Sequence, residues 1–404
     1  MKSDVYFLSA RTFSKRESMA RIKGPIGLQK IGFEDKIRKD DKVVIKTHFG
    51  ALENTRYLRP SYIRFLCDYV KRLGGHPSVA ESCGWGIPGA KGEYGGRANE
   101  KEYLEVALRH GFTPNTMGAP LLMLDGSEGL NYIIQKIKGE YFEEIRVAGR
   151  LQEFNHMILA SHFKGHSGAG FGGAIKNLGI GCVSKGGKTE AHTSKTFAFN
   201  FEKCEPDCNR CVEICPTGAL ARTQNKQLIF QEDKCRYCYM CSSVCKENGA
   251  IEIGTVSRAQ FIYQMVDNAK GVIDFYNNEN ISYINYAIDI TWKCDCCGGS
   301  DVPFVNDIGI LTSKDPVALD QACVDLTHDS FMNRNSILNE IQGLIPSEKY
   351  KWFSYIPRFE EGEINLNKEG IKDHHWEIQL QAAEKIGLGN RDYNLIPIEI
   401  EQEE

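Results

Sequence analysis

The chain contains CEPDCNRCVEICP at 204–216 and CRYCYMCSSVC at 235–245, and these two stretches decide the fold of its most distinctive segment. Each stretch holds four cysteines separated by two or three residues. Three thiolates at this spacing can surround one corner of an iron–sulfur cubane, while the fourth cysteine reaches the other cluster. The spacing therefore predicts two [4Fe–4S] clusters. The predicted ligands are Cys204, Cys208, Cys211 and Cys245 for cluster I, and Cys215, Cys235, Cys238 and Cys241 for cluster II.

Zinc is the main alternative, because Cys-x2-Cys pairs also bind zinc. Zinc accounts neither for the third close cysteine nor for Pro216 after the fourth, and a disulfide framework is a weaker alternative. Residues 195–256 also repeat internally and resemble a bacterial two-cluster ferredoxin. They depart from that pattern in the three-residue gap after Cys204 and in Lys246, which stands where a proline is usual.

The composition bounds the class of protein. A chain of 404 residues is far longer than a ferredoxin and can bury at least one large core. A net charge of −4 with scattered basic residues argues against nucleic-acid binding. No stretch has the length of a membrane span, and the first residues lack a signal-peptide pattern. Fifteen cysteines then favour a reducing cytoplasm, where thiolates serve metals and redox chemistry.

Outside the cysteine segment, short β-branched runs alternate with amphipathic stretches. We expect strands at 5–8, 42–47, 77–80, 121–124, 156–162, 272–276, 282–290 and 308–312, and helices at 18–31, 62–73, 101–110, 317–326 and 374–386. The alternation predicts an α/β fold, with a mainly parallel (mixed) sheet and helices on both faces. Because it resumes after the cysteines, residues 195–256 are predicted to be an α+β insertion between 1–194 and 257–404, the second part ending in a helix and an acidic tail.

The densest polar stretch leaves the carboxyl end of the expected strand 156–162, where open α/β sheets place their ligands. It supplies candidate catalytic residues His162, Lys164, His166 and His192, and candidate anion-binding residues Gly172, Gly173, Lys176, Asn177 and Lys188.

This stretch also matches the dinucleotide fingerprint G-x-G-x-x-G at 168–173. The expected strand ends several residues earlier, and the run is so rich in glycine that a chance match is expected. We favour an anion site made by loop N–H groups, a helix N-terminus and Lys176. A tight structural crossover is the other alternative.

Two further groups join this one. His48 follows the strand 42–47 and is a further candidate catalytic residue at the same sheet edge, and Cys83 follows the third strand and could add to the rim. Cys294 and Cys296, with Cys297 beside them, could ligate an extra metal. Free thiols, inert or redox-active, are the favoured interpretation of these cysteines.

The chain resembles the uncharacterised Fe–S centre proteins, a domain-of-unknown-function family of bacteria and archaea. The matching blocks are KTHFG (46–50), His162 to Gly181, Lys188 with His192, CDC (294–296), DIGIL (307–311), KDPVA (314–318) and DQA (320–322). The resemblance implies one α/β domain with an inserted two-cluster module, and it implies no particular reaction.

The leading hypothesis is a cytoplasmic oxidoreductase that relays electrons between a ferredoxin-like or other redox partner and a small anionic substrate at the sheet edge. Lysines would hold the anion, and a histidine would transfer the accompanying proton. One alternative is a non-enzymatic electron carrier or cluster-delivery protein. Another is a site for an additional metal or metallocofactor that the clusters keep reduced.

Overall fold

A mixed eight-stranded sheet forms the centre of the molecule. The computed structural model describes residues 2–89, 95–245, 249–341, 344–356, 358–360, 363–365 and 374–400. The strand order is β18 (Tyr393–Pro397), β1 (Ser3–Ser9), β15 (Gly309–Ser313), β14 (Ile281–Ala287), β7 (His156–His162), β2 (Lys42–Lys46), β3 (His76–Glu81) and β4 (Leu121–Met123). Only the two pairs that β15 makes, with β1 and β14, are antiparallel. The predicted α/β class with a mainly parallel sheet is confirmed.

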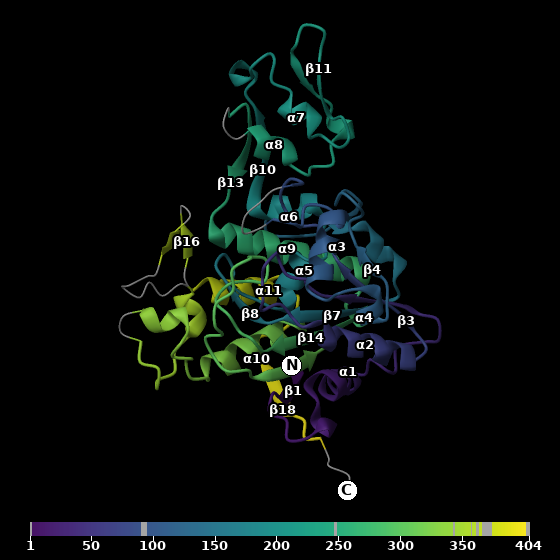
Figure 1. Ribbon diagram of the computed structural model, residues 1–404, viewed down its shortest axis with the longest axis vertical. Helices are drawn as coiled ribbons and strands as arrows, with labels where there is room; N and C mark the ends of the chain where they lie inside the picture. Colours follow the sequence, from purple (N-terminus) through teal and green to yellow (C-terminus); the bar gives the residue numbers. More distant parts are fainter. Residues whose placement is uncertain are drawn as a thin grey trace.

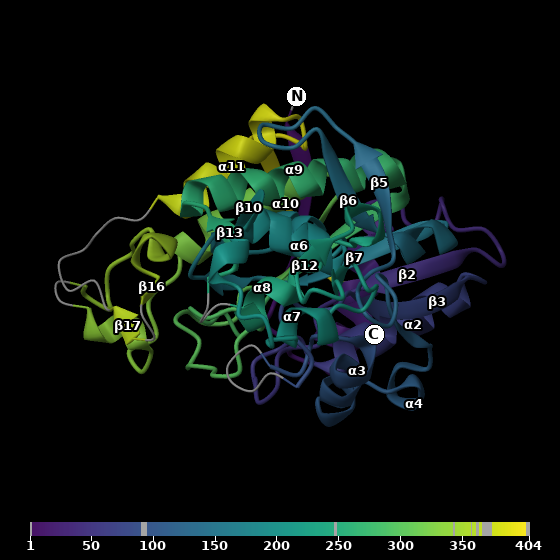
Figure 2. The ribbon, with the colours of Figure 1, turned by 90° about the horizontal axis from the view of Figure 1, so that it is seen from above.

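Helices cover both faces of this sheet, as Figure 2 shows. Alternate strand residues face opposite sides, so Val43 and Ile45 pack in one core while Val44 packs in the other. The first core contains α1 (Gly24–Lys30), α2 (Pro60–Arg72), α3 (Glu100–Arg109) and α4 (Pro114–Met117). The second contains α5 (Ala174–Gly179), α9 (Arg258–Tyr276), α10 (Pro316–His328) and α11 (His375–Lys385).

One expected strand is wrong. Residues 272–276 form the last part of α9, which runs from Arg258 to Tyr276. Ser257 caps the start of this helix, and its side chain accepts from the N–H of Gln260. Its residues Phe261, Met265 and Val272 are buried on one side, so packing over a long helix outweighs the local β-branched and aromatic composition.

Shorter elements complete the fold. Among the described residues, the two-stranded antiparallel sheets outside the module are β5 (Tyr132–Lys136) with β6 (Glu144–Ala148), β8 (Lys164–His166) with β9 (Gly170–Gly172), and β16 (Arg358–Glu360) with β17 (Glu363–Asn365). The remaining turns of helix are η1 (Lys15–Glu17), η2 (Met19–Lys23), η3 (Gly149–Glu153), η6 (Asn278–Asn280), η7 (Ile337–Glu340), η8 (Trp352–Tyr355) and α6 (Lys185–His192).

The cysteine-rich segment stands apart at the top of Figure 1, on a ribbon formed by β10 (Thr193–Phe199) and β13 (Ile251–Thr255). The strands of the central sheet that precede and follow it in sequence, β7 and β14, are neighbours in that sheet. We call the part from 195 to 256 the module. It contains η4 (Phe201–Lys203), α7 (Arg210–Glu213), β11 (Leu220–Arg222), β12 (Leu228–Phe230), η5 (Glu232–Lys234) and α8 (Met240–Cys245).

Candidate functional site

A cavity of about 670 Å³ opens where the parallel strands β2, β3 and β7 end. Loops that follow these strands form its wall, together with α5, the end of α6 and the loop after β14. Apart from Cys83, every candidate residue that the sequence places outside the cysteine quartets lines it. These are His48, His162, Lys164, His166, Gly172, Gly173, Lys176, Asn177, Lys188, His192, Cys294 and Cys296.

The glycine-rich stretch is shaped by packing of the chain against itself. A side chain at Gly173 would place its Cβ 2.3 Å from Oδ1 of Asp320, and one at Gly170, where φ is +81°, would meet the backbone of Trp376. Asp320 accepts hydrogen bonds from the N–H groups of Ala174 and Ile175, at 2.8 and 2.9 Å. The predicted anion site at this helix N-terminus is therefore wrong, because a carboxylate of the chain already fills it.

Three histidines in the wall are neutral. Burial lowers the pKa of His48 well below its ordinary value, and Arg97 adds to the effect. Burial, followed by Lys176, likewise lowers the pKa of His166 strongly and that of His192 to about 4. A neutral imidazole N–H can donate a hydrogen bond to a substrate without adding charge to the cavity.

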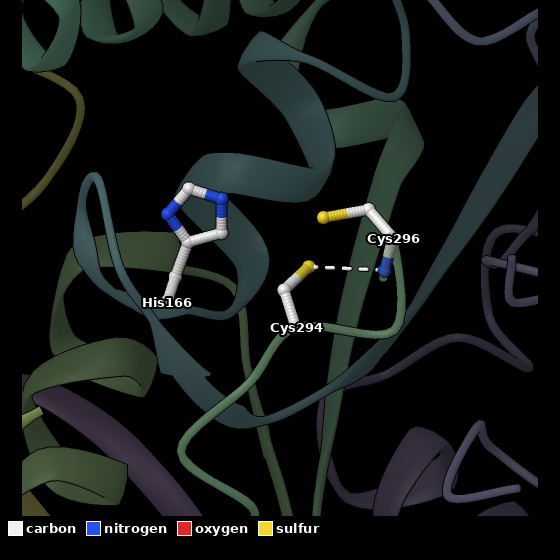
Figure 3. Close-up of side chains that lie close together, drawn as sticks. All are labelled: His166, Cys294 and Cys296. Atoms are coloured by element: carbon white, nitrogen blue, oxygen red, sulfur yellow. Dashed lines mark hydrogen bonds between the residues drawn. The ribbon is translucent and has the colours of Figure 1, made fainter. Parts of the chain in front are cut away.

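The tautomer of His166 follows from its hydrogen bonds. Its Nδ1 accepts from the N–H groups of Gly168 and Ala169, at 3.1 and 2.9 Å, so the ring proton is on Nε2. In Figure 3 the ring turns Nε2 toward the sulfurs of Cys294 and Cys296. His166 therefore presents a hydrogen-bond donor to these two sulfurs.

His162 is held between two acceptors. Its Nδ1 lies 2.9 and 3.0 Å from the two carboxylate oxygens of Asp295, and its Nε2 lies 2.7 Å from the carbonyl of Ile288. Lys164 lies 3.3 Å from the same carboxylate. Burial alone would raise the pKa of Asp295, but His162 and Lys164 outweigh it and hold that pKa well below its usual range. Both ring nitrogens of His162 thus position the loop that carries the two cysteines.

Cys294 and Cys296 lie on either side of this fixed carboxylate. Their sulfurs and a ring nitrogen of His166 all lie within 4.8 Å of one another. The ammonium of Lys176 is 3.4 Å from the sulfur of Cys294, and the backbone N–H of Cys296 lies at the same distance from that sulfur. Burial by itself lowers the pKa of Lys176, but Cys294 and Cys296 outweigh it and raise that pKa.

The other candidate residues are anchored within the wall. Asn177 accepts from Lys46 at 2.9 Å and donates to Ser161 at 3.0 Å. Lys188 donates to the hydroxyl of Ser82 at 2.6 Å, and burial lowers its pKa. Cys83 lies in the hydrophobic core and not at the cavity, so its predicted place on the rim is wrong.

Sequence patterns missed three residues of the wall. Arg97 donates to the carbonyl of Cys296 at 2.9 Å, and its Nε is buried with no hydrogen-bond partner among the described residues. Phe261 of α9 stacks on His192, with ring centroids 4.3 Å apart, and Glu81 forms a 2.6 Å ion pair with Lys46. None of the three belongs to a local motif, and only Glu81, at the end of β3, has a position that points to the site.

The module contributes to the same cavity. Ser243 of α8 lines it, as do Val256 and Ser257 after β13. Ser243 lies two residues from Cys241 and two from Cys245, so one helix joins the cysteine-rich part to the cavity wall.

The cysteines of the module form two groups. One group, Cys204, Cys208, Cys211 and Cys245, lines a single small cavity. The thiols of Cys215, Cys235 and Cys238 each raise the pKa of Cys241 beyond the effect of its burial, so these four also lie close together. All fifteen cysteines are free thiols, and the disulfide alternative is wrong.

One relative matches only a short part of the chain, and two solved structures match most of the chain at low similarity. The chain is 34% identical over 51 residues to a ferredoxin of Methanothermococcus thermolithotrophicus. This match covers 12% of the chain and 85% of the ferredoxin. The apoprotein of lactate racemase from Thermoanaerobacterium thermosaccharolyticum has a TM-score of 0.39 at 12% identity, over 82% of this chain. A Thermotoga maritima protein gives 0.37 at 12% identity, over 76% of this chain. The chain spans 58% and 59% of the lengths of these two proteins.

No helix among the described residues is both long and apolar enough to cross a membrane. The family model described as a domain of unknown function, DUF362, matches residues 43–325, which include the central strands β2 to β15, the cavity and the module. The chain therefore belongs to the DUF362 family and carries a ferredoxin-like module.

Proposed function

We propose that this protein is an iron–sulfur oxidoreductase in which the module exchanges electrons with a small anionic substrate bound in the cavity. The observation that carries the proposal is the position of Ser243. It lies between two cysteines of the module and lines the cavity that also contains His166 and Lys176.

The two groups of cysteines fit two [4Fe–4S] clusters, one per group. Each group offers four free thiols close together. Three of them come from one cysteine-rich stretch, and the fourth is the last cysteine of the other stretch. Bound there, such clusters would supply single electrons. Within the group of Cys204, the guanidinium of Arg222 lies 3.2 Å from that sulfur and is placed to offset negative charge.

The charge of the cavity favours an anionic substrate. Among the described residues, its wall carries Arg97, Lys164, Lys176, Lys188, Arg258 and Lys293, against the single carboxylate of Glu81. The Nε of Arg97 is buried without a partner among the described residues, and a carboxylate or phosphate oxygen would satisfy it. A volume of about 670 Å³ suits a small organic molecule.

The neutral histidines suit hydrogen bonding to a substrate. His166 carries its proton on Nε2, which faces the cavity sulfurs, so it can donate a hydrogen bond that stabilises negative charge developing there. His48 accepts from the N–H of Gly50 through Nδ1, at 2.8 Å, and its other nitrogen also carries the proton. His162 would act by positioning Asp295 and its loop.

The experiment is anaerobic purification followed by iron, sulfide and electron paramagnetic resonance measurements. We expect about eight irons and two reducible clusters per chain. Protein reduced with dithionite is then mixed with a panel of small carboxylates and phosphate esters, and reoxidation is followed in the visible spectrum. Absence of iron would overturn the proposal, and reducible clusters that no anion reoxidises would favour the alternative of an electron carrier.

A matched pair of variants connects reoxidation to the cavity. Arg97→Gln should slow reoxidation by the active anion at least about tenfold while leaving the iron content unchanged, since a charge-assisted hydrogen bond contributes about 1.5 kcal/mol or more. Arg109→Gln removes the same charge from an exposed position on α3 and should have no effect. Equal rates in both variants would contradict an anion site at Arg97.

The carrier alternative rests on the exposed position of the module, which leaves Cys204 and Cys208 partly accessible to a docking ferredoxin-like partner. The same exposure is required of an oxidoreductase that receives electrons from such a partner. Fifteen free thiols and oxygen-sensitive clusters suit the reducing cytoplasm, which we propose as the location.

A further inference from the structure

The cavity holds a second pair of sulfurs that the module does not use. Clusters of the proposed kind exchange electrons singly, whereas reduction or oxidation of a closed-shell organic anion requires two. The electron pair must therefore be assembled from single electrons, either by both clusters together or by a group between the module and the substrate that collects them. Cys294 and Cys296 are placed for this task, because both line the cavity that Ser243 of the module also lines.

The two sulfurs are close enough to pair. They lie within 4.8 Å of one another in the reduced form (Figure 3), and rotation about the two side chains is needed to bring them to the S–S bond length of about 2.05 Å. Their backbone is fixed on both sides. Asp295 between them is held by His162 and Lys164, and the carbonyl of Cys296 accepts from Arg97.

Cys296 and burial raise the pKa of the Cys294 thiol, and the cations around it offset part of that rise and disfavour a metal cation. Lys176 donates to the sulfur of Cys294 at 3.4 Å, and the guanidinium of Arg97 lies beside Cys296. Cations next to a thiol stabilise the thiolate, which is the species that attacks and forms disulfides. The same cations repel a divalent metal ion.

His166 argues in the same direction. A histidine that ligates a metal usually donates its second ring N–H to a carboxylate or a carbonyl. Here Nδ1 instead accepts two backbone N–H groups, and the proton sits on Nε2, on the side of the sulfurs. His166 is thus a hydrogen-bond donor to the sulfurs and lacks the free lone pair that a metal would need.

We infer that Cys294 and Cys296 form a redox-active dithiol–disulfide pair that converts single electrons from the module into the electron pair taken up by the substrate. The disulfide accepts two electrons and two protons, the S–S bond breaks, and two thiols form. In the second half, the thiols return two electrons and two protons to the oxidised substrate, and the S–S bond forms again. The inference rests on the proposed function for its electron donor, a ferredoxin-class protein acting through the module.

The test measures the thiols directly. Trypsin cuts after Lys293 and Lys314, and the peptide between them holds Cys294, Cys296 and Cys297. Anaerobic holoprotein is equilibrated with dithiothreitol couples of increasing oxidised fraction, alkylated, digested and analysed by mass spectrometry. We expect three alkyl groups under reducing conditions and one under oxidising conditions. A second sample, oxidised first, is reduced through the module by a reduced ferredoxin and should recover all three.

Variants identify the pair. Cys297→Ser is the matched control, because Cys297 is adjacent to Cys296 and buried. In this variant, oxidising conditions should still remove two alkyl groups from the peptide. Cys294→Ser and Cys296→Ser should abolish it. Three alkyl groups under every condition, or an unchanged disulfide in Cys294→Ser, would overturn the inference, as would one zinc or nickel ion per chain that leaves with Cys294→Ser.

The two proposals fail separately. Intact clusters with no disulfide would overturn the dithiol pair alone. If the anaerobically purified protein contains no iron but Cys294 and Cys296 still form a disulfide, the proposed function is overturned. A disulfide that forms in holoprotein but is not reduced through the module would overturn the conversion of single electrons into pairs.

Discussion

The ammonium of Lys176 lies 3.4 Å from the sulfur of Cys294, inside the buried wall of the cavity. The sequence separates the two residues by 118 positions, and the fold joins them through α5 and the loop after β14. This contact places a permanent positive charge beside the first cysteine of the proposed redox pair.

Lys176→Met should therefore make Cys294 less reactive. Without the ammonium the thiolate loses its nearest counter-charge, and we expect the alkylation of Cys294 by iodoacetamide at pH 8 to slow about tenfold, which corresponds to about one unit in the thiol pKa. Lys293→Met is the control, since Lys293 lines the same cavity and its ammonium lies over the ring of Trp292. Equal slowing in both variants would mean that general charge, and not the contact, controls the thiol.

The crossed assignment of the cysteines predicts the effect of removing Cys215. Although Cys215 is contiguous with the first stretch, it groups with Cys241, so Cys215→Ala should remove cluster II and leave cluster I. We expect the iron content to fall from about eight to about four per chain, with one cluster signal retained in electron paramagnetic resonance spectra. Cys182→Ala, which changes a buried cysteine in the core of the central domain and not in the module, should keep both signals. Loss of both clusters in Cys215→Ala alone would contradict independent sites.

Asp320 links α10 to the start of α5 and should make stability depend on pH. Burial raises its pKa from 3.8 to about 6, so the folded protein binds the proton more tightly than the unfolded chain does. The contribution of Asp320 to the free energy of unfolding is then highest below pH 4, and it falls by about 2 to 3 kcal/mol in total as the pH rises to 6. Urea denaturation at several pH values in this range, with wild type and Asp320→Asn compared, isolates this contribution.

The control for Asp320 is Asp274→Asn, on the more exposed side of α9, which should keep the wild-type slope between pH 4 and 6. Asp320→Asn itself should lose that slope. It should also be less stable at pH 7 by about 1 to 3 kcal/mol, because one of the N–H groups of Ala174 and Ile175 would lose its acceptor. A slope that survives in Asp320→Asn would assign the dependence to another group.

The sheet and its edge were predictable because they depend on local patterns. Buried β-branched runs such as 42–47 and 156–162 identify strands, and parallel strands bring the loops after them to one edge. This is why His48 and His166 line one cavity although 118 residues separate them. The residues at 272–276 have the composition of a strand, but their place at the end of a long amphipathic helix decides their structure.

Other parts of the site depend on contacts that no local pattern records. Arg97 and Phe261 belong to a loop and a helix that reach the cavity only when the whole domain has formed. Gly170 belonged to a dinucleotide fingerprint and Gly173 suggested a bound anion, whereas the reason for these glycines is the close approach of Trp376 and Asp320. Such contacts involve residues more than a hundred positions apart, so they are visible only in the structure.

A buried ion pair supports the floor of the cavity and gives the last prediction. Lys46 and Glu81 are 2.6 Å apart at the ends of adjacent strands, and neither side chain is more than 4% exposed. Lys46→Met leaves the carboxylate of Glu81 buried without its partner, and we expect a loss of about 3 to 5 kcal/mol in the free energy of unfolding. Lys46→Met combined with Glu81→Leu should cost less than the sum of the single variants by about 1 to 3 kcal/mol.

The comparison is Arg150→Met, which breaks a more exposed pair with Glu153 and should cost about 1 kcal/mol or less. Denaturation under anaerobic conditions provides all four values, and strictly additive losses would show that Lys46 and Glu81 act on stability independently.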